Sequence, residues 1–184
     1  MSLELIIGPM FSGKTSELIR YANRYKSIGK NILIVNHIWD KKRTKSLNIR
    51  SHDGMIYDAL FIEKMYDILE NDNYYKADVI LIEEAQFFND LYSFISKHIS
   101  FDKKFIVFGL SGGFNMQKLG QILDLIPLCD KLTKLDSFCI KCNDGTLAPF
   151  TKRIAPVGNK KDSEMVGGSG EYIAVCRKHY NEQI

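Results

Sequence analysis

Hydrophobic residues in the first two thirds of the chain follow two alternating patterns. Short runs that are continuously apolar are typical of strands buried on both faces, and such runs occur at residues 3–7, 31–35, 79–82 and 105–110. Between them, apolar residues recur at offsets of three and four over residues 15–28, 59–69 and 91–99, which predicts amphipathic helices. This alternation predicts an α/β domain over residues 1–136, in which helices cover both faces of a parallel sheet.

The chain changes in character at two places. Residues 40–54 are polar and basic, and we expect an exposed loop there. After Asp136 the helical periodicity disappears, Cys, Gly, Pro and Lys become frequent, and residues 158–170 form a polar loop rich in glycine at its end. We therefore expect a small lobe over residues 137–184 that is held together by something other than its own hydrophobic core.

A glycine-rich motif follows the first predicted strand. Residues 8–15 match the pattern G-x4-G-K-[ST] and stand directly before a predicted helix. Glycines let successive backbone N–H groups curl around phosphates, and the helix N-terminus adds partial positive charge. The Lys would reach the β- and γ-phosphates, and the Thr hydroxyl would bind magnesium. The alternative is a glycine turn with an incidental lysine, but the context favours a nucleotide site made of Gly8, Pro9, Met10, Phe11, Ser12, Gly13, Lys14 and Thr15.

Two acidic residues end the third predicted strand. Glu83 and Glu84 lie at its carboxyl end, where open α/β sheets form their ligand crevice. Consecutive residues of a strand point to opposite sides, so the two carboxylates should have different roles. One carboxylate near a metal ion and the other near an acceptor hydroxyl would suit phosphoryl transfer. The alternative is a pair of solvated acids at the end of a strand.

Four potential metal ligands occur as two close pairs in the C-terminal part of the chain. Cys139 and Cys142 form one pair, Cys176 and His179 form the other, and 33 residues separate the pairs. Tetrahedral zinc accepts three thiolates and one imidazole, and four protein ligands leave no open position for catalysis. The spacing therefore predicts a structural zinc ion that replaces the missing core of the lobe. The alternatives are free cysteines with a surface histidine, or a nucleic-acid-binding ribbon, which the lack of interleaved aromatic and basic residues disfavours.

Composition adds few constraints. The 184 residues are 45% hydrophobic and 26% charged, which is ordinary for a globular protein, and the net charge of +3 permits anionic ligands without arguing for nucleic acid. No basic segment precedes the first apolar run, and no run approaches the roughly 18 residues of a membrane span, so we expect a cytoplasmic protein with no membrane partner. We expect Trp39, His98 and Cys129 to be packing residues.

In combination, these motifs resemble those of the thymidine kinases of the cellular, bacterial and poxvirus type (type II), which differ from the herpesvirus type. The segments that carry the resemblance are GPMFSGKT at residues 8–15, IEEAQFF at 82–88, LSGGF at 110–114, FTKR at 150–153 and VGG…Y…VCRKHY over 166–180. The resemblance implies a P-loop NTPase-like fold and transfer of the γ-phosphoryl group of Mg-ATP to the 5′-hydroxyl of thymidine, and of deoxyuridine. It also implies a homotetramer, inhibition by dTTP, and a role in nucleotide salvage for DNA synthesis.

The resemblance also assigns roles to individual residues. Glu84 would be the general base for the 5′-hydroxyl, and Glu83 and Gln86 would organise Mg-ATP. Asp40 and Arg43 would correspond to the family's Asp-x-Arg loop near the phosphates. Phe114 and Tyr172 would flank the thymine, Met10 and Thr151 would lie near its methyl group, and residues 163–167 would supply backbone hydrogen bonds to base and sugar. The implied nucleoside site comprises Met10, Phe87, Phe114, Thr151, Ser163, Glu164, Met165, Val166, Gly167 and Tyr172.

Three positions depart from the family's pattern. Glu83 stands where the family usually has Asp, so magnesium would be held through a longer side chain. Two residues separate Asp40 from Arg43, where the family has one. His179 replaces the more common fourth Cys of the metal site, as in bacterial members.

Two rival hypotheses remain at this stage. The first is a nucleic-acid-associated zinc-ribbon NTPase that binds through basic residues of the polar stretch, namely Lys41, Lys42, Arg43, Lys45 and Arg50. The second is a binding protein with an inactive phosphate loop, which is disfavoured because Lys14, Thr15 and both acids are present.

Overall fold

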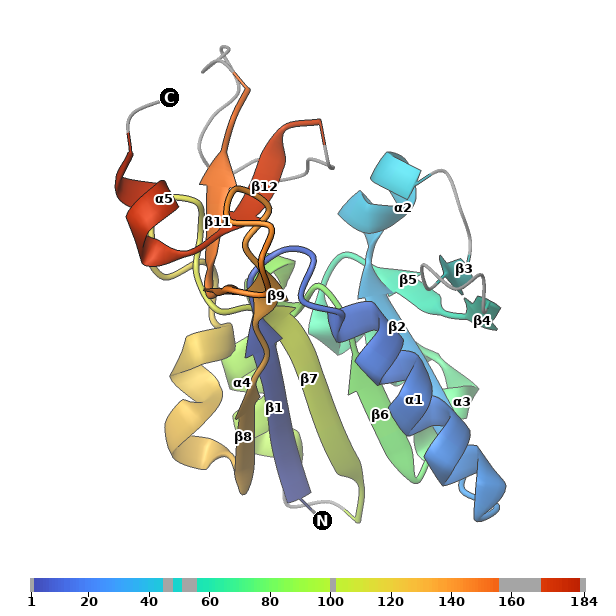
Figure 1. Cartoon of the computed structure of the whole chain (residues 1–184). Helices are drawn as coiled ribbons and strands as arrows, with labels where there is room; N and C mark the ends of the chain where they lie inside the picture. The colour runs from blue at the N-terminus through green and yellow to red at the C-terminus, as the bar shows by residue number, and fades with distance from the viewer. Residues whose placement is uncertain (1, 45–47, 51–55, 100–101, 156–169, 183–184) are drawn as a thin grey trace.

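A six-stranded sheet forms the centre of the molecule in the computed structural model (Figure 1). The structure describes the chain except residues 1, 45–47, 51–55, 100–101, 156–169 and 183–184. The strands pair in the order β5-β2-β6-β7-β1-β8, and all of these pairs are parallel. They are β1 (Ser2–Gly8), β2 (Ile32–His37), β5 (Leu60–Ile62), β6 (Val79–Ile82), β7 (Lys104–Leu110) and β8 (Lys131–Lys134). The expected α/β class is confirmed.

Helices cover both faces of this sheet. Ile6 of β1 points to one face, where it packs with Leu18 and Ile19 of the first long helix. Its neighbour Leu5 points to the other face, into a cluster that includes Phe94. Burial on both faces explains why the inner strands are continuously apolar. The helices are α1 (Lys14–Ser27), α2 (Ile38–Thr44), α3 (Asp72–Lys76), α4 (Leu91–His98) and α5 (Arg177–Asn181), with 3-10 helices η1 (Met65–Glu70), η2 (Ala85–Phe87) and η3 (Ile122–Leu128).

Two expectations about residues 40–69 were wrong. The segment 59–69, predicted as a helix, instead contains β5 and then η1, and β5 pairs with Val35–His37 of β2. The edge of β2 presents backbone N–H and C=O groups that need partners, and this requirement outweighs the helical spacing of the side chains. The stretch 40–54, predicted as a loop, includes most of α2 and the strand β3 (Asn48–Arg50), which pairs with β4 (Ile56–Asp58).

The C-terminal part of the chain forms two small antiparallel sheets near the carboxyl ends of the central strands (Figure 1). Among its described residues, Cys139, Ala148, Ala174 and Val175 form a small buried cluster. The domain boundary expected after residue 136 falls directly before β9, and the division into two domains stays a prediction. Within the described part of the chain, no helix has the length and apolar character to cross a membrane. The strands of this part are β9 (Ser137–Phe138), β10 (Leu147–Ala148), β11 (Phe150–Arg153) and β12 (Tyr172–Val175).

Candidate active site

The glycine-rich motif forms the turn between β1 and α1. A Cβ atom on Gly8 would lie 2.5 Å from the Ser12 Oγ and 2.8 Å from the Leu135 carbonyl oxygen, so a larger residue does not fit. Gly13 has φ 79°, a left-handed conformation that glycine adopts without strain, directly before the first residue of α1. The chain therefore turns tightly enough to aim the N-terminus of α1 into the space at the end of the sheet.

Lys14 lies inside this turn. Its Nζ donates a hydrogen bond to the Pro9 carbonyl oxygen at 2.6 Å. Burial lowers the pKa of Lys14, while the nearby carboxylates of Glu84 and Glu83 favour its charged form. The ammonium group thus lies close enough to both acids for their charges to act on it, as a site for a highly charged ligand requires.

Glu83 follows β6 and faces the start of α1. The Thr15 hydroxyl donates a hydrogen bond to Glu83 Oε1 at 2.5 Å. Burial and the negative charges of Glu84 and Asp40 raise the pKa of Glu83 from 4.5 to about 8, against the opposing effects of Thr15 and Lys14. A carboxylate and a hydroxyl are hard oxygen ligands, and a carboxylate surrounded by other negative charges gains from a cation, so this pair fits magnesium.

At Glu84 the backbone leaves the extended conformation of strand β6. The φ of Glu84, 50°, lies in the left-handed region, which is uncommon for a residue with a side chain and is often found at functional sites. Its carboxylate is half-buried, and its Oε2 accepts a hydrogen bond from Gln86 Nε2 at 2.6 Å. Glu83 and Glu84 therefore have different partners.

Asp40 lies near Glu83, since its charge contributes to the raised pKa of Glu83. Its Oδ2 accepts a hydrogen bond from Asn36 Nδ2 at 2.9 Å. The backbone of Arg43 belongs to α2, and its side chain lies outside the described part of the structure.

An apolar cluster lies beside the phosphate loop. Met10 packs with Phe114 and Tyr172, together with Leu110 and Leu119. The rings of Phe114 and Tyr172 are 6.3 Å apart and inclined by 40°. The structure therefore brings together three of the side chains expected around the thymine, although their positions in the sequence are far apart.

The structure also places two of the other residues that were expected to contact the nucleoside. Thr151 is buried, and its Oγ1 accepts a hydrogen bond from the Met10 backbone N–H at 2.9 Å, which links β11 to the phosphate loop. Phe87 packs on His37 and Trp39, with ring distances of 5.7 and 5.4 Å. Residues 163–167 lie outside the described residues.

Sequence reasoning missed three residues of this region. Leu110 and Leu119 complete the apolar cluster, and no motif signalled Leu119. The guanidinium of Arg153 lies 5.7 Å from the centre of the Phe114 ring. Arg153 belongs to the FTKR motif, so the motif could have drawn attention to it as a site residue. Its contact with Phe114 depends on the fold and could not be read from the sequence.

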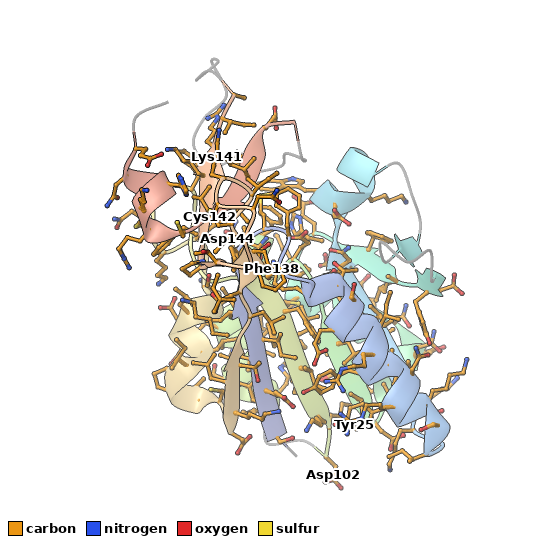
Figure 2. The ribbon with its side chains drawn as sticks, viewed as in Figure 1. Tyr25, Asp102, Phe138, Lys141, Cys142 and Asp144 are labelled. Carbon is orange, nitrogen blue, oxygen red and sulfur yellow. The ribbon has the colours of Figure 1, made fainter. Side chains whose placement is uncertain are left out.

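A pocket of about 480 Å³ adjoins the phosphate loop. Its walls include Phe11, Phe138 and Tyr172. Figure 2 shows Phe138 near the middle of the molecule, with Cys142 above it and Tyr25 and Asp102 below it. Lys14 and Glu84 are not among the residues that line this pocket.

The four predicted metal ligands come together in one cluster. Their ligand atoms all lie within 4.8 Å of one another. The His179 Nδ1 is 3.3 Å from the Cys142 sulfur and 3.4 Å from each of the Cys139 and Cys176 sulfurs, and the sulfurs of Cys142 and Cys176 are 3.8 Å apart. In a regular zinc tetrahedron with Zn–S about 2.3 Å and Zn–N about 2.0 Å, the S···S and S···N distances are about 3.8 and 3.5 Å. The cluster therefore has the dimensions of a tetrahedral metal site.

Electrostatics at this cluster also favour a cation. Burial opposes ionisation of Cys139, but backbone N–H groups donate to its sulfur and bring its pKa below the usual range. Burial and the neighbouring sulfurs raise the pKa of Cys142. Several thiolates so close together repel one another, and a bound metal ion removes that repulsion.

Comparison of the sequence with those of known proteins shows the family of the chain. The sequence model of the thymidine kinase family matches residues 1–180. The chain belongs to the thymidine kinase family. It is 42% identical over 186 residues to a thymidine kinase of Choristoneura fumiferana entomopoxvirus, with 99% of this chain and 97% of the relative covered. It is 37% identical to the sheeppox virus thymidine kinase, with 97% and 96% covered. It is also 37% identical to thymidine kinase a of Arabidopsis thaliana, with 97% and 74% covered.

Membership in the thymidine kinase family confirms the resemblance read from the sequence motifs. The matched segment includes the phosphate loop, both acids and all four residues of the Cys/His cluster. The individual roles of the site residues stay predictions.

Proposed function

We propose that the protein transfers the γ-phosphoryl group of Mg-ATP to the 5′-hydroxyl of thymidine, and to that of deoxyuridine, in nucleotide salvage. The observation that carries this proposal is the placement of Lys14 near Glu83 and Glu84, whose carboxylates act on the charge of the lysine and bind different partners, Thr15 and Gln86. A cationic group for phosphates and two carboxylates with different partners meet the needs of phosphoryl transfer.

The phosphate loop and the end of β6 bind Mg-ATP in this proposal. Backbone N–H groups of residues 8–15 and the Lys14 ammonium hold the β- and γ-phosphates. Thr15 and Glu83 hold magnesium, which when bound neutralises charge on those phosphates. Asp40, Arg43 and Gln86 were also assigned to this part of the site, and Asp40 is supported by its effect on Glu83.

Glu84 acts as the general base for the acceptor. Its carboxylate accepts the proton of the 5′-hydroxyl as the oxygen attacks the γ-phosphorus in line with the leaving oxygen. The half-buried position leaves the carboxylate accessible to a substrate, and its closeness to Lys14 puts it beside the phosphate site. Positioning and charge neutralisation supply most of the acceleration.

The nucleoside binds against the apolar cluster of Met10, Phe114 and Tyr172. Flat aromatic and apolar side chains are suited to the faces of a pyrimidine ring. Backbone groups of residues 163–167 complete the site, because a pyrimidine with the wrong donor and acceptor pattern would leave buried polar groups unpaired, at a cost of about 1–3 kcal/mol each.

The Cys/His cluster holds a structural zinc ion, which supports the small core of the C-terminal part. We further propose inhibition by dTTP, a homotetramer and a cytoplasmic location, all of which rest on the family resemblance.

A nucleotide-release assay tests the proposed function. ADP release from ATP should rise on addition of thymidine, with thymidine monophosphate formed in equal amount. ADP release that responds only to DNA or RNA would instead support the zinc-ribbon NTPase.

A further inference from the structure

Gln86 connects two parts of the active site. Its Nε2 donates to Glu84 Oε2 at 2.6 Å, and its Oε1 accepts from the Leu110 backbone N–H at 3.1 Å. The side chain is buried, with 3% of its surface exposed. A single amide thus ties the carboxylate after β6 to the end of β7.

The surroundings of Gln86 hold it in place. A Cβ atom on Gly109 would lie 2.7 Å from the Gln86 Oε1, and one on Gly120 would lie 1.9 Å from the Gln86 carbonyl oxygen. Gln86 therefore occupies space that is open only because residues 109 and 120 are glycines without a Cβ atom. The opposite amide orientation would set the carbonyl oxygen against the Glu84 carboxylate and the NH₂ group against the Leu110 N–H, so only one orientation satisfies both contacts.

The hydrogen bond from Gln86 engages one of the two oxygens of Glu84. A carboxylate on a freely rotating side chain must be ordered before it can accept a proton from a substrate hydroxyl, and a donor held by the sheet removes that cost. The left-handed backbone of Glu84 adds a second restriction on where the carboxylate can lie.

We propose that Gln86 is a positioning residue that orients the Glu84 carboxylate toward the acceptor hydroxyl. This inference rests on the proposed role of Glu84 as general base. It differs from the role in organising Mg-ATP that the family resemblance implies for Gln86, since the two side-chain hydrogen bonds described above go to Glu84 and to β7.

The test compares steady-state kinetics of Gln86→Met with those of wild type. Methionine has a similar length and volume but can neither donate to Glu84 nor accept strongly from Leu110. We expect kcat to fall about 10–100-fold, the loss expected for a charge-assisted hydrogen bond, with KM for ATP and thymidine changed less than about 3-fold. Gln121→Met is the matched control, because Gln121 Oε1 accepts from the Tyr92 N–H at 2.9 Å without touching Glu84.

A second arm combines the substitution with Glu84→Gln. If Gln86 acts through the Glu84 carboxylate, adding Gln86→Met to Glu84→Gln should lower kcat by less than about 2-fold further. Thermal unfolding of every variant separates loss of stability from loss of turnover. If Gln86→Met does not fold, Gln86→Asn replaces it, since that side chain keeps the amide but is one methylene too short to span both contacts.

Three results would overturn the inference. These are wild-type kcat in a folded Gln86 variant, an increase in KM for ATP with kcat unchanged, and a loss of kcat that is equally large in the Glu84→Gln background. Failure of the proposed function is distinguishable, because wild type itself would then show no thymidine-dependent turnover. Wild-type turnover in Glu84→Gln alone would instead show that Glu84 is not the general base.

Discussion

Glu83 is a carboxyl group that the fold has removed from water and placed beside Glu84 and Asp40. These neighbours and its burial raise its pKa from 4.5 to about 8. Between these values the folded protein holds a proton on Glu83 that the unfolded chain has lost. The free energy of unfolding therefore falls as pH rises through this window. This loss of stability is the cost of burying a carboxylate where it can bind a cation.

This pKa shift predicts how Glu83→Gln changes stability. The substitution removes the titrating group, so the variant should unfold at a higher temperature than wild type near pH 8.5, by on the order of 10 °C, and at a similar temperature near pH 5. Thermal unfolding in magnesium-free buffer measures the difference. No chelator is added, because it would also remove a metal ion bound by the Cys/His cluster. A temperature difference that is the same at both pH values would show that Glu83 does not titrate in this window.

At the scale of secondary structure, β11 supports the phosphate loop through the hydrogen bond from the Met10 N–H to Thr151 Oγ1. We expect Thr151→Val to reduce the free energy of unfolding by roughly 1–3 kcal/mol, because the shape is kept while a backbone donor loses its acceptor. We also expect KM for ATP to rise, since Met10 belongs to the loop. Chemical denaturation and steady-state kinetics measure both effects.

Thr151→Ser is the matched control for this prediction, because it keeps the hydroxyl. It should retain most of the stability and the wild-type KM for ATP. An equal loss of stability in the two variants would show that the methyl group of Thr151, and not the hydrogen bond, is what matters.

The sequence pattern was sufficient to predict the inner strands of the sheet. It also predicted strand β1 before the phosphate loop and helix α1 after it. Strand β6 coincides with the predicted run 79–82, because burial on both faces requires continuous apolar residues. Edge elements could not be predicted in this way. Strand β8 is mostly polar and exposed, and it is fixed by pairing with β1 and by an ion pair of 2.6 Å between Lys131 and the buried Glu4.

The candidate site likewise contains some features that local sequence predicts and others that depend on contacts between distant residues. The phosphate loop and the metal ligands have fixed local spacing, so sequence alone suggested them. The contacts of Thr151 with Met10 and of Arg153 with Phe114 join residues far apart in the chain, and their existence depends on how β11 lies against the central sheet. No local pattern encodes such contacts.

At the scale of the whole molecule, the C-terminal part has a small buried core and contains Thr151 and Tyr172, which belong to the proposed nucleoside site. A bound metal would therefore stabilise the substrate site from a distance. We expect about one zinc ion per chain in the purified protein, and we expect Cys142→Ser to lose it, because three ligands bind much more weakly than four. Thymidine binding should weaken more than ATP binding, as the phosphate loop belongs to the central sheet.

Metal analysis and calorimetric titration with each substrate measure these effects. Cys129→Ser is the matched control, because the Cys129 sulfur donates to the Ile126 carbonyl oxygen and lies outside the cluster. It should keep its zinc and its thymidine affinity. Stable, metal-free wild-type protein with full thymidine affinity would contradict a structural role for the cluster.

The most direct test of the proposed mechanism is the single-turnover rate of thymidine phosphorylation by Glu84→Gln, with thymidine affinity measured in parallel. Glutamine keeps the size of the side chain but cannot accept the proton of the 5′-hydroxyl. We expect the rate to fall by about 10²–10⁴-fold while thymidine affinity stays close to that of wild type. A wild-type rate in this variant would show that Glu84 is not the general base and that the carboxylates beside Lys14 do not act as proposed.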